Sequence, residues 1–436
     1  SINGKFSQQE QGLPMKIGMV TAVYKPVING VTRMISQYKE CLERQGHEVT
    51  IFTLGDPDPA GDEANVVRSP AIPIGDYGYQ LGVRYTREAR DRVRAMEILH
   101  CHHLVFGVDF AHRYGRSPVV LTNHTRHDLY TSAYLPLPQG AADALVRQVW
   151  PEYAGMADTV IAPSASVRDV MLQFGVTQPI EVIPNGVDLG LFYHPQAPRT
   201  KSDLGIPDAA LLAVYTGRLA DEKNLEILLQ QFSLAVDIIP DLHLLLVGHG
   251  PAKDDLAFLA RKLGLADRVH MMGPVEYRQM PDVLAAADFY VTASVTEVHP
   301  LALIEAMAVG LPVAASRSPG IIDTVENGVS GFLTSDPENG LSAAIVALAI
   351  NPELRIRIGD NARQASRAYD INHTVARTVD LYNRLLAERP DLQREHKHGR
   401  WYRPQSKIKP RLKDIVRKMG LDDDDHGYHN GQVDDD

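Results

Sequence analysis

Cysteine is almost absent from this sequence, and the shortage excludes several classes of protein. Only Cys41, in a helical pattern, and Cys101, in a strand pattern, occur in 436 residues. Two such cysteines make no disulfide framework, which favours a reducing compartment. No run of eighteen apolar residues is present, so no transmembrane helix is expected, and the first residues contain no apolar signal core. We therefore expect a cytoplasmic protein.

Positive charge is also in short supply. The formal net charge is −10, which argues against nucleic acid as a partner. The charge is uneven along the chain, because seven aspartates follow Leu421 and the remainder carries about −3. Hydrophobic residues make up 44% of the 436 positions, enough for the cores of two or three domains.

The most informative segment runs from Ser294 to Val309. It predicts a loop followed by a helix that begins at Pro300, is apolar on all sides and stops at a glycine. One charge, Glu305, interrupts the buried helix and needs a partner. A second carboxylate, Glu297, lies in the loop. Two interpretations are open: Glu305 binds a polyol while the helix tip binds an anion, or Glu305 pairs with a core Arg or Lys.

Glu297 and Glu305, with seven residues between them and EAMA beginning at the second, resemble the retaining glycosyltransferases of family four. Further segments agree over roughly residues 15–388. The resemblance implies an α/β protein of the GT-B type, with two facing Rossmann-like domains, doubly wound parallel sheets and an interdomain cleft. It also implies that Glu305 holds the ribose of a nucleotide sugar and that Glu297 lies near the donor sugar.

One motif departs from the family. Many relatives have Gly-Phe-Gly after the first glutamate, whereas this chain has Val298-His299-Pro300. The resemblance still places His299, Pro300 and Leu301 at the donor, with backbone contacts to the pyrophosphate that differ in detail.

The N-terminal part predicts a βαβ unit: a strand within Lys16–Tyr24, a helix from Val31 to about Arg44, and a strand over His47–Leu54. Asn29 and Gly30 precede the helix, where a plain turn and a ligand loop are both reasonable. The resemblance favours the ligand loop and places it against the donor phosphates.

Histidines gather at two predicted strand ends. Residues 98–107 contain three histidines and Cys101, but their alternation along a strand does not close a tetrahedral metal site. His124 stands at the end of the strand that starts near Pro118, where open α/β sheets bind ligands. Any single one of the 17 histidines is more often a surface residue or a buried one with its hydrogen bonds made within the protein. By resemblance, His124 faces the donor sugar.

The segment from Tyr130 to Trp150 is rich in Tyr, Leu and Pro. It is either a buried packing loop or an exposed apolar loop that meets an apolar acceptor, with Tyr130 and Tyr134 as candidate acceptor contacts. Residues Leu189 to Thr200 are expected to link the two domains.

The second domain opens with a strand that ends at Gly217, followed by Arg218 and Lys223. Loop cations are usually only solvated, but two of them at a strand end can clamp a diphosphate, and the resemblance favours this. It also places the backbone of Pro274 and Val275 against the base.

The predicted organisation is a disordered lead or tag (1–14), an acceptor domain (15–190), a donor domain (200–371), a helix that crosses back (372–388) and a tail (390–436). Residues 391–420 contain ten Lys and Arg against three Asp and Glu. This basic part of the tail either forms an amphipathic helix on an anionic membrane, as at the inner face of the plasma membrane, or folds onto the acidic body.

The expected function is a metal-independent retaining hexosyltransferase that uses a nucleoside diphosphate sugar, with a UDP-sugar as the default donor and no cofactor. His124, Glu297, Arg218 and Lys223 are the expected catalytic residues. The acceptor hydroxyl is open, with a lipid such as diacylglycerol as one candidate and a polysaccharide or small molecule as another. A GT-B epimerase and a non-catalytic sugar-nucleotide-binding module remain as alternatives.

Overall fold

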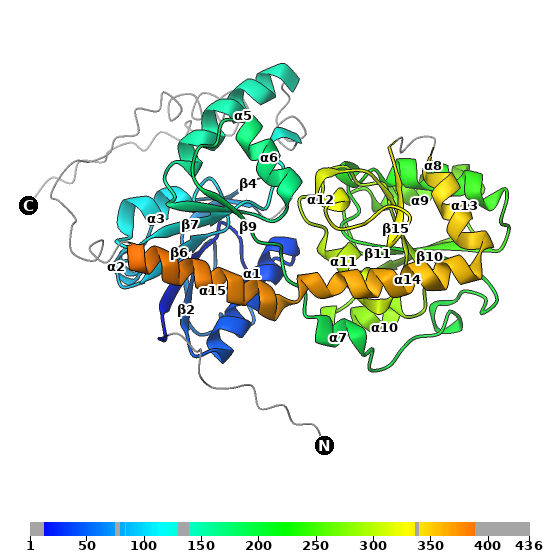
Figure 1. Ribbon diagram of the computed structural model, residues 1–436, viewed down its shortest axis with the longest axis horizontal. Coiled ribbons are helices and arrows are strands. Elements are labelled where there is room, and N and C mark those ends of the chain that lie inside the picture. Colours follow the sequence, from blue (N-terminus) through cyan, green and yellow to red (C-terminus); the bar gives the residue numbers. More distant parts are fainter. Residues whose placement is uncertain (1–12, 75–78, 83, 130–138, 336–339, 389–436) are drawn as a thin grey trace, which may run out of the picture. The chain divides into compact units, whose positions relative to one another are not determined.

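The computed structural model describes residues 13–74, 79–82, 84–129, 139–335 and 340–388. Two separate parallel sheets, each covered by helices, organise this part of the chain (Figure 1). Tyr130, Tyr134 and the tail 390–436 lie outside the described residues.

The first sheet has seven strands in the order β3-β2-β1-β6-β7-β8-β9, all parallel. The strands are β1 (Lys16–Val20), β2 (Glu48–Leu54), β3 (Val66–Ser69), β6 (Ile98–Cys101), β7 (Val119–Thr122), β8 (Thr159–Ala162) and β9 (Ile180–Val182). The helices among them are α1 (Gly30–Arg44), α2 (Arg87–Val93), α3 (Val108–Tyr114), α5 (Gln139–Ala154) and α6 (Ala165–Gln173). Between β3 and α2, the chain forms a separate two-stranded antiparallel sheet of β4 (Ala71–Ile74) and β5 (Tyr79–Gly82).

The second sheet has six parallel strands in the order β12-β11-β10-β13-β14-β15. They are β10 (Leu211–Thr216), β11 (Leu242–Val247), β12 (Val269–Gly273), β13 (Phe289–Thr292), β14 (Val313–Ser316) and β15 (Gly331–Thr334). Its larger helices are α8 (Leu225–Val236), α9 (Lys253–Lys262), α11 (Leu301–Val309), α13 (Leu341–Ile350) and α14 (Pro352–Ser366), and its short ones α10 (Met280–Leu284) and α12 (Pro319–Ile322). The two doubly wound parallel sheets confirm the predicted fold class.

Short apolar runs form these strands because both faces of a parallel sheet are covered by helices. Every residue of β11 is buried, for example. The predicted strand that begins at Lys16 ends at Val20 rather than near Tyr24, because Thr21 to Tyr24 leave the sheet to begin the loop before α1.

The segment expected to be a plain linker contains a helix, α7 (Leu189–Tyr193). Leu189 and Phe192 are buried in the apolar cluster that also holds Leu212 and Val214 of β10. Their burial on the second sheet explains why this part of the segment is ordered as a helix.

The last described helix, α15 (Ile371–Glu388), packs beside α1 (Figure 1). Its residues Val375 and Tyr382 join an apolar cluster with Ile17 of β1 and Ile51 of β2. The chain therefore returns to the first sheet after completing the second. Among the described residues, no helix is long and apolar enough to cross a bilayer.

Candidate active site

Helix α11 begins one residue later than predicted. Pro300 is the residue before the helix, because its ψ of 89° lies outside the helical range, and Leu301 is the first helical residue. The Pro300 carbonyl accepts hydrogen bonds from the backbone N–H groups of Leu303 and Ile304, both at 3.1 Å. The side chain of Leu301 packs against apolar clusters of both sheets.

Glu305 lies on α11 and is only 2% exposed. Nη1 of Arg33, from α1, donates to Glu305 Oε1 at 2.8 Å. The Arg33 guanidinium also lies 4.7 Å from the ring centroid of Tyr277, whose hydroxyl accepts a 2.9 Å hydrogen bond from Gln37. Burial raises the pKa of Glu305, although Arg33 opposes that shift. Glu305 thus has a basic partner, Arg33, as one of the two interpretations of the sequence required.

Glu297 is paired with a cation from the strand end of β10. Lys223 Nζ lies 2.7 Å from Glu297 Oε1, and Ser294 Oγ donates to the same oxygen at 2.7 Å. Burial acts to raise the pKa of Glu297, but Lys223 and Ser294 outweigh it and hold the pKa below its usual range. The structure brings together two of the predicted catalytic residues.

Arg218 lies in the same loop, where its guanidinium pairs with Glu222. Glycines position this loop: Gly217 has φ of +154° and Gly248 has φ of +142°. A Cβ added at Gly248 would lie 1.9 Å from the Gly217 carbonyl oxygen. The close backbone approach at the ends of β10 and β11 therefore requires glycine.

Histidines meet at the ends of β6 and β7, which are adjacent strands. His102 Nδ1 lies 3.1 Å from Nε2 of His124, and the two rings are stacked. His100 contacts Tyr382 and Thr122 instead, each at 2.6 Å. Burial lowers the pKa of His102 and of His124 well below the usual range, so both rings are neutral at pH 7.

Asn29 and Gly30 are the start of a helix rather than a sharp turn. Asn29, at φ −146°, is the residue before α1, and its side chain accepts from the backbone of Thr32 at 2.9 Å while the Thr32 hydroxyl accepts from the backbone of Asn29. Gly30 is the first helical residue. The loop is thereby held at the tip of the helix that carries Arg33.

Three other predicted donor residues have defined surroundings. His299 is 7% exposed, and its Nδ1 has no hydrogen-bond partner within the described ranges. Pro274 and Val275 follow Gly273, the end of β12, and Val275 packs against the apolar cluster of the second sheet.

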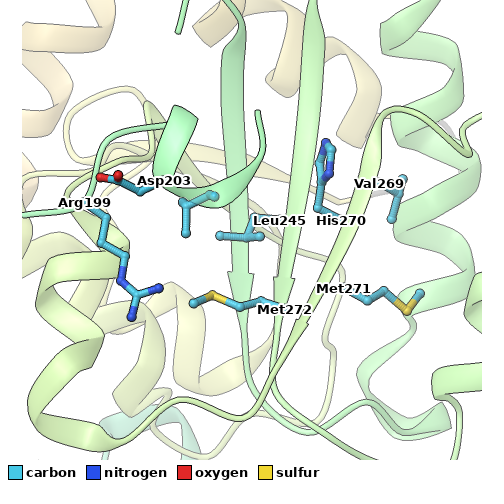
Figure 2. Close-up of a pocket in the computed structure, with 8 residues that line it drawn as sticks. Arg199, Asp203, Leu245, Val269, His270, Met271 and Met272 are labelled. Carbon is cyan, nitrogen blue, oxygen red and sulfur yellow. The ribbon is translucent and has the colours of Figure 1, made fainter. Parts of the chain in front are cut away.

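A cavity of about 490 Å³ lies beside strands β11 and β12 of the second sheet (Figure 2). It is formed by strands β11 and β12, by η1 (Ser202–Leu204) and by the segment before η1, and is lined by Arg199, Asp203, Leu204, Leu245, Val269, His270, Met271 and Met272. None of the predicted donor or catalytic residues lines it.

Sequence reasoning missed Arg33 and Tyr277 as neighbours of the predicted site, and it did not single out His102 within the histidine-rich strand end. Arg33 had one available signal, since it lies one helical turn after Asn29 and a buried Glu305 required a cation. Nothing in the sequence indicated that Tyr277 would lie beside it. Among the described residues, no group of three or more His, Cys, Asp or Glu is arranged to hold a metal ion.

Two family models match consecutive parts of this chain. The model described as Glycosyltransferase Family 4 matches residues 28–191, and the one described as Glycosyl transferases group 1 matches residues 196–365. The chain belongs to these glycosyltransferases. The predicted family is confirmed, and the enzyme is a nucleotide-sugar-dependent transferase.

The names of curated relatives of this glycosyltransferase specify two kinds of acceptor. Alpha-monoglucosyldiacylglycerol synthase of Streptococcus pneumoniae is 27% identical, with 78% of this chain and 80% of the relative covered. The synthase of the same name from Acholeplasma laidlawii is 27% identical, with 81% and 93% covered. D-inositol 3-phosphate glycosyltransferase of Streptomyces griseus is 29% identical, with 70% of each chain covered.

Solved structures share the fold of this glycosyltransferase. Anabaena HepE in complex with UDP and glucose has a TM-score of 0.67 and 21% identity, with 85% of this chain and 100% of that chain covered. Sucrose-phosphate synthase from Thermosynechococcus elongatus has a TM-score of 0.70 and 22% identity, with 86% and 100% covered. These likenesses confirm the GT-B fold.

Proposed function

We propose that this glycosyltransferase moves a hexose from UDP-hexose to a lipid hydroxyl such as that of diacylglycerol, with retention of the anomeric configuration. The similarity to two alpha-monoglucosyldiacylglycerol synthases over 78% and 81% of this chain carries the proposal. Their names specify an alpha product, which retention would give from an alpha-linked nucleotide sugar.

In this proposal, Glu305 accepts hydrogen bonds from the ribose hydroxyls. A carboxylate has two oxygens, and Arg33 occupies one of them at 2.8 Å, so the ribose shares Glu305 with Arg33 or displaces it. Hydrogen bonds to charged groups contribute about 1.5–3 kcal/mol each, which is enough for the exchange. The backbone near Pro274 and Val275 faces the base.

Arg218 and Lys223 bind the diphosphate and balance the charge of the leaving group. Each is already held beside a carboxylate, Arg218 by Glu222 and Lys223 by Glu297, so both side chains are positioned before the donor arrives. The tip of α1 at Asn29 and Gly30 and the backbone of His299, Pro300 and Leu301 complete the contacts to the phosphates.

The transfer uses no protein base. The bond from the anomeric carbon to the diphosphate oxygen breaks, the acceptor oxygen forms its bond on the same face, and the acceptor proton passes to a donor phosphate oxygen. His124 and Glu297 orient the sugar and stabilise its cation-like transition state. Exclusion of water limits hydrolysis of the donor.

Two further parts of the proposal concern segments outside the described residues. Tyr130 and Tyr134 contact the apolar acceptor, and the basic part of the tail, residues 391–420, binds anionic lipid at the inner face of the membrane. Removal of residues 391–436 should weaken binding to vesicles that contain phosphatidylglycerol, while the truncated enzyme still hydrolyses UDP-glucose. Equal vesicle binding by both forms would contradict this role of the tail.

The proposed reaction is tested with UDP-glucose and dioleoylglycerol in vesicles that contain phosphatidylglycerol. We expect a glucolipid whose anomeric proton identifies the alpha linkage by NMR. Lys223→Met should lower the rate at least about a hundredfold, because a leaving-group cation is lost. Lys201→Met is the matched control, since Lys201 also lies 2.7 Å from a carboxylate, on Asp288, and its side chain is equally exposed at 17%.

A second candidate acceptor is favoured by one observation. The relative from Streptomyces griseus, named for D-inositol 3-phosphate, is 29% identical over 334 residues. The same assay is therefore run with inositol 3-phosphate in place of the lipid. Product with this acceptor and none with dioleoylglycerol would replace the lipid proposal, and a beta-linked product would refute retention.

A further inference from the structure

The contact between His102 and His124 gives the first of these residues a role beyond packing. His102 directly follows β6 and is 1% exposed, whereas His124 follows β7 and is only half-buried. Because Cys101 pairs with Leu121 in parallel register, both histidines emerge at the same edge of the sheet. Nδ1 of His102 and Nε2 of His124 are 3.1 Å apart, within hydrogen-bond distance.

A hydrogen bond between two neutral imidazoles requires one nitrogen to donate and the other to accept. The other nitrogen of His102, Nε2, is buried and has no hydrogen-bond partner in the part of the chain that the structure describes. If Nε2 carried the proton, a buried N–H donor would be left unpaired, at a free-energy cost of about 1–3 kcal/mol. Orphaned buried N–H groups are rarer than under-used acceptors, so the proton of His102 belongs on Nδ1.

This choice determines the state of the neighbouring ring. With Nδ1–H of His102 donating, Nε2 of His124 must accept and therefore carries no proton. The single proton of neutral His124 then lies on Nδ1, the nitrogen that remains for a ligand. Burial lowers the pKa of both rings well below the usual range, which agrees with two neutral imidazoles.

We propose that His102 is a positioning residue that fixes His124 in the Nδ1–H tautomer, so that His124 presents a hydrogen-bond donor to the donor sugar. With the opposite tautomer, His124 would offer only a lone pair there. The same bond also fixes the plane of the His124 ring. This role rests on the proposed function, because it is His124 that meets the sugar.

The neighbouring histidines do not share this role. His100 uses both ring nitrogens, on Tyr382 and Thr122. Nδ1 of His103 accepts a hydrogen bond from the backbone N–H of Ala22 at 3.2 Å.

Three variants separate positioning from packing. His102→Phe keeps a ring but removes the donor, and His102→Asn places an amide N–H near the position of Nδ1. His243→Phe is the control, because buried His243 has its Nδ1 2.9 Å from Nε2 of half-buried His270 in a second stacked histidine pair. The control loses this contact in the second sheet together with the 2.8 Å contact between His243 Nε2 and Arg268 Nη1, so its effect is an upper limit for the loss of packing and hydrogen bonding alone.

The first readout is long-range ¹H–¹⁵N NMR of the full chain labelled with ¹⁵N-histidine, which identifies the protonated ring nitrogen. We expect the proton of His124 on Nδ1 in the native protein and in His102→Asn, and a mixture of tautomers in His102→Phe. A native His124 with its proton on Nε2 overturns the proposal. This measurement needs no turnover, so it decides the tautomer even if the proposed reaction fails.

The second readout is the rate with UDP-glucose and dioleoylglycerol. Loss of the hydrogen-bond partner that orients a metal-bound histidine lowers activity about tenfold to a hundredfold, and we take the same range for His124. We expect kcat of His102→Phe to fall by this factor with little change in KM for UDP-glucose, and His102→Asn to recover most of it. A fall in His102→Phe no larger than that in His243→Phe, or no recovery in His102→Asn, overturns the positioning role.

Discussion

Removing Arg33 should destabilise the protein much more than neutralising its partner Glu305. The carboxylate of Glu305 is 2% exposed, whereas the Arg33 side chain is 29% exposed. Arg33→Met therefore leaves a charge that water cannot reach, and breaking a buried pair in this way costs about 3–5 kcal/mol. Glu305→Gln keeps an acceptor for the guanidinium, which can still hydrate, and should cost only about 1 kcal/mol.

The double variant Arg33→Met/Glu305→Gln should be more stable than Arg33→Met alone, because no buried charge remains. Urea denaturation followed by circular dichroism gives the four free energies of unfolding and the coupling between the two sites. Arg94→Met is the control, since Arg94 and Asp91 form an exposed pair that should contribute under about 1 kcal/mol.

The cost of Arg33→Met should also depend on pH. Burial raises the pKa of Glu305 in the folded protein, so the folded state binds a proton more tightly than the unfolded one. The stability that depends on this proton is present at low pH and is lost as the pH rises through the raised pKa. The penalty of Arg33→Met should thus be larger at pH 8 than at pH 5. A penalty that is independent of pH, or as small as that of Arg94→Met, would refute the reasoning.

Three other variants test separate features. Gly248→Ala should destabilise the protein by about 1–3 kcal/mol and lower its melting temperature, because the new Cβ would lie 1.9 Å from the Gly217 carbonyl oxygen; an unchanged melting temperature would contradict the close approach. Tyr382→Phe removes the 2.6 Å contact with buried His100 and should lower the free energy of unfolding by about 1–3 kcal/mol in urea denaturation. A loss under about 0.5 kcal/mol, the range of surface substitutions, would contradict it. The pKa of Glu297 is lowered, so the stability that comes from its pairing with Lys223 is present above the ordinary carboxyl pKa and is lost as the pH falls through the lowered pKa. Glu297→Gln should therefore make the free energy of unfolding depend less on pH in the acid range. An unchanged dependence on pH would exclude the pairing.

Local sequence signals predicted the sheets well but not the contacts between distant residues. Apolar runs such as the one around Leu245 indicate buried strands because both faces of a parallel sheet need apolar side chains. The need of Glu305 for a partner was predictable from its apolar helix, but the identity of that partner was not. Arg33 lies 272 positions earlier, and only the packing of α1 near α11 brings the two together. His102 likewise required knowledge of which strands are adjacent.

Pro300 shows why the first residue of a helix is hard to predict from sequence. Proline suits both the first helical position and the residue before it, and the choice depends on ψ, which the sequence does not determine. The prolines of segment 189–200 predict a linker, but Leu189 and Phe192 pack on the apolar cluster of the second sheet.

The return of α15 to the first sheet sets an order of events during synthesis. The strands of that sheet end at Val182, but α15, which packs on α1 and shares an apolar cluster with Ile17 and Ile51, begins only at Ile371. A ribosome must therefore translate the whole second sheet before α15 completes this cluster, a period when a nascent chain is prone to aggregate. An isolated first domain would need α15 joined ahead of Lys16, as in a circular permutant, to be complete.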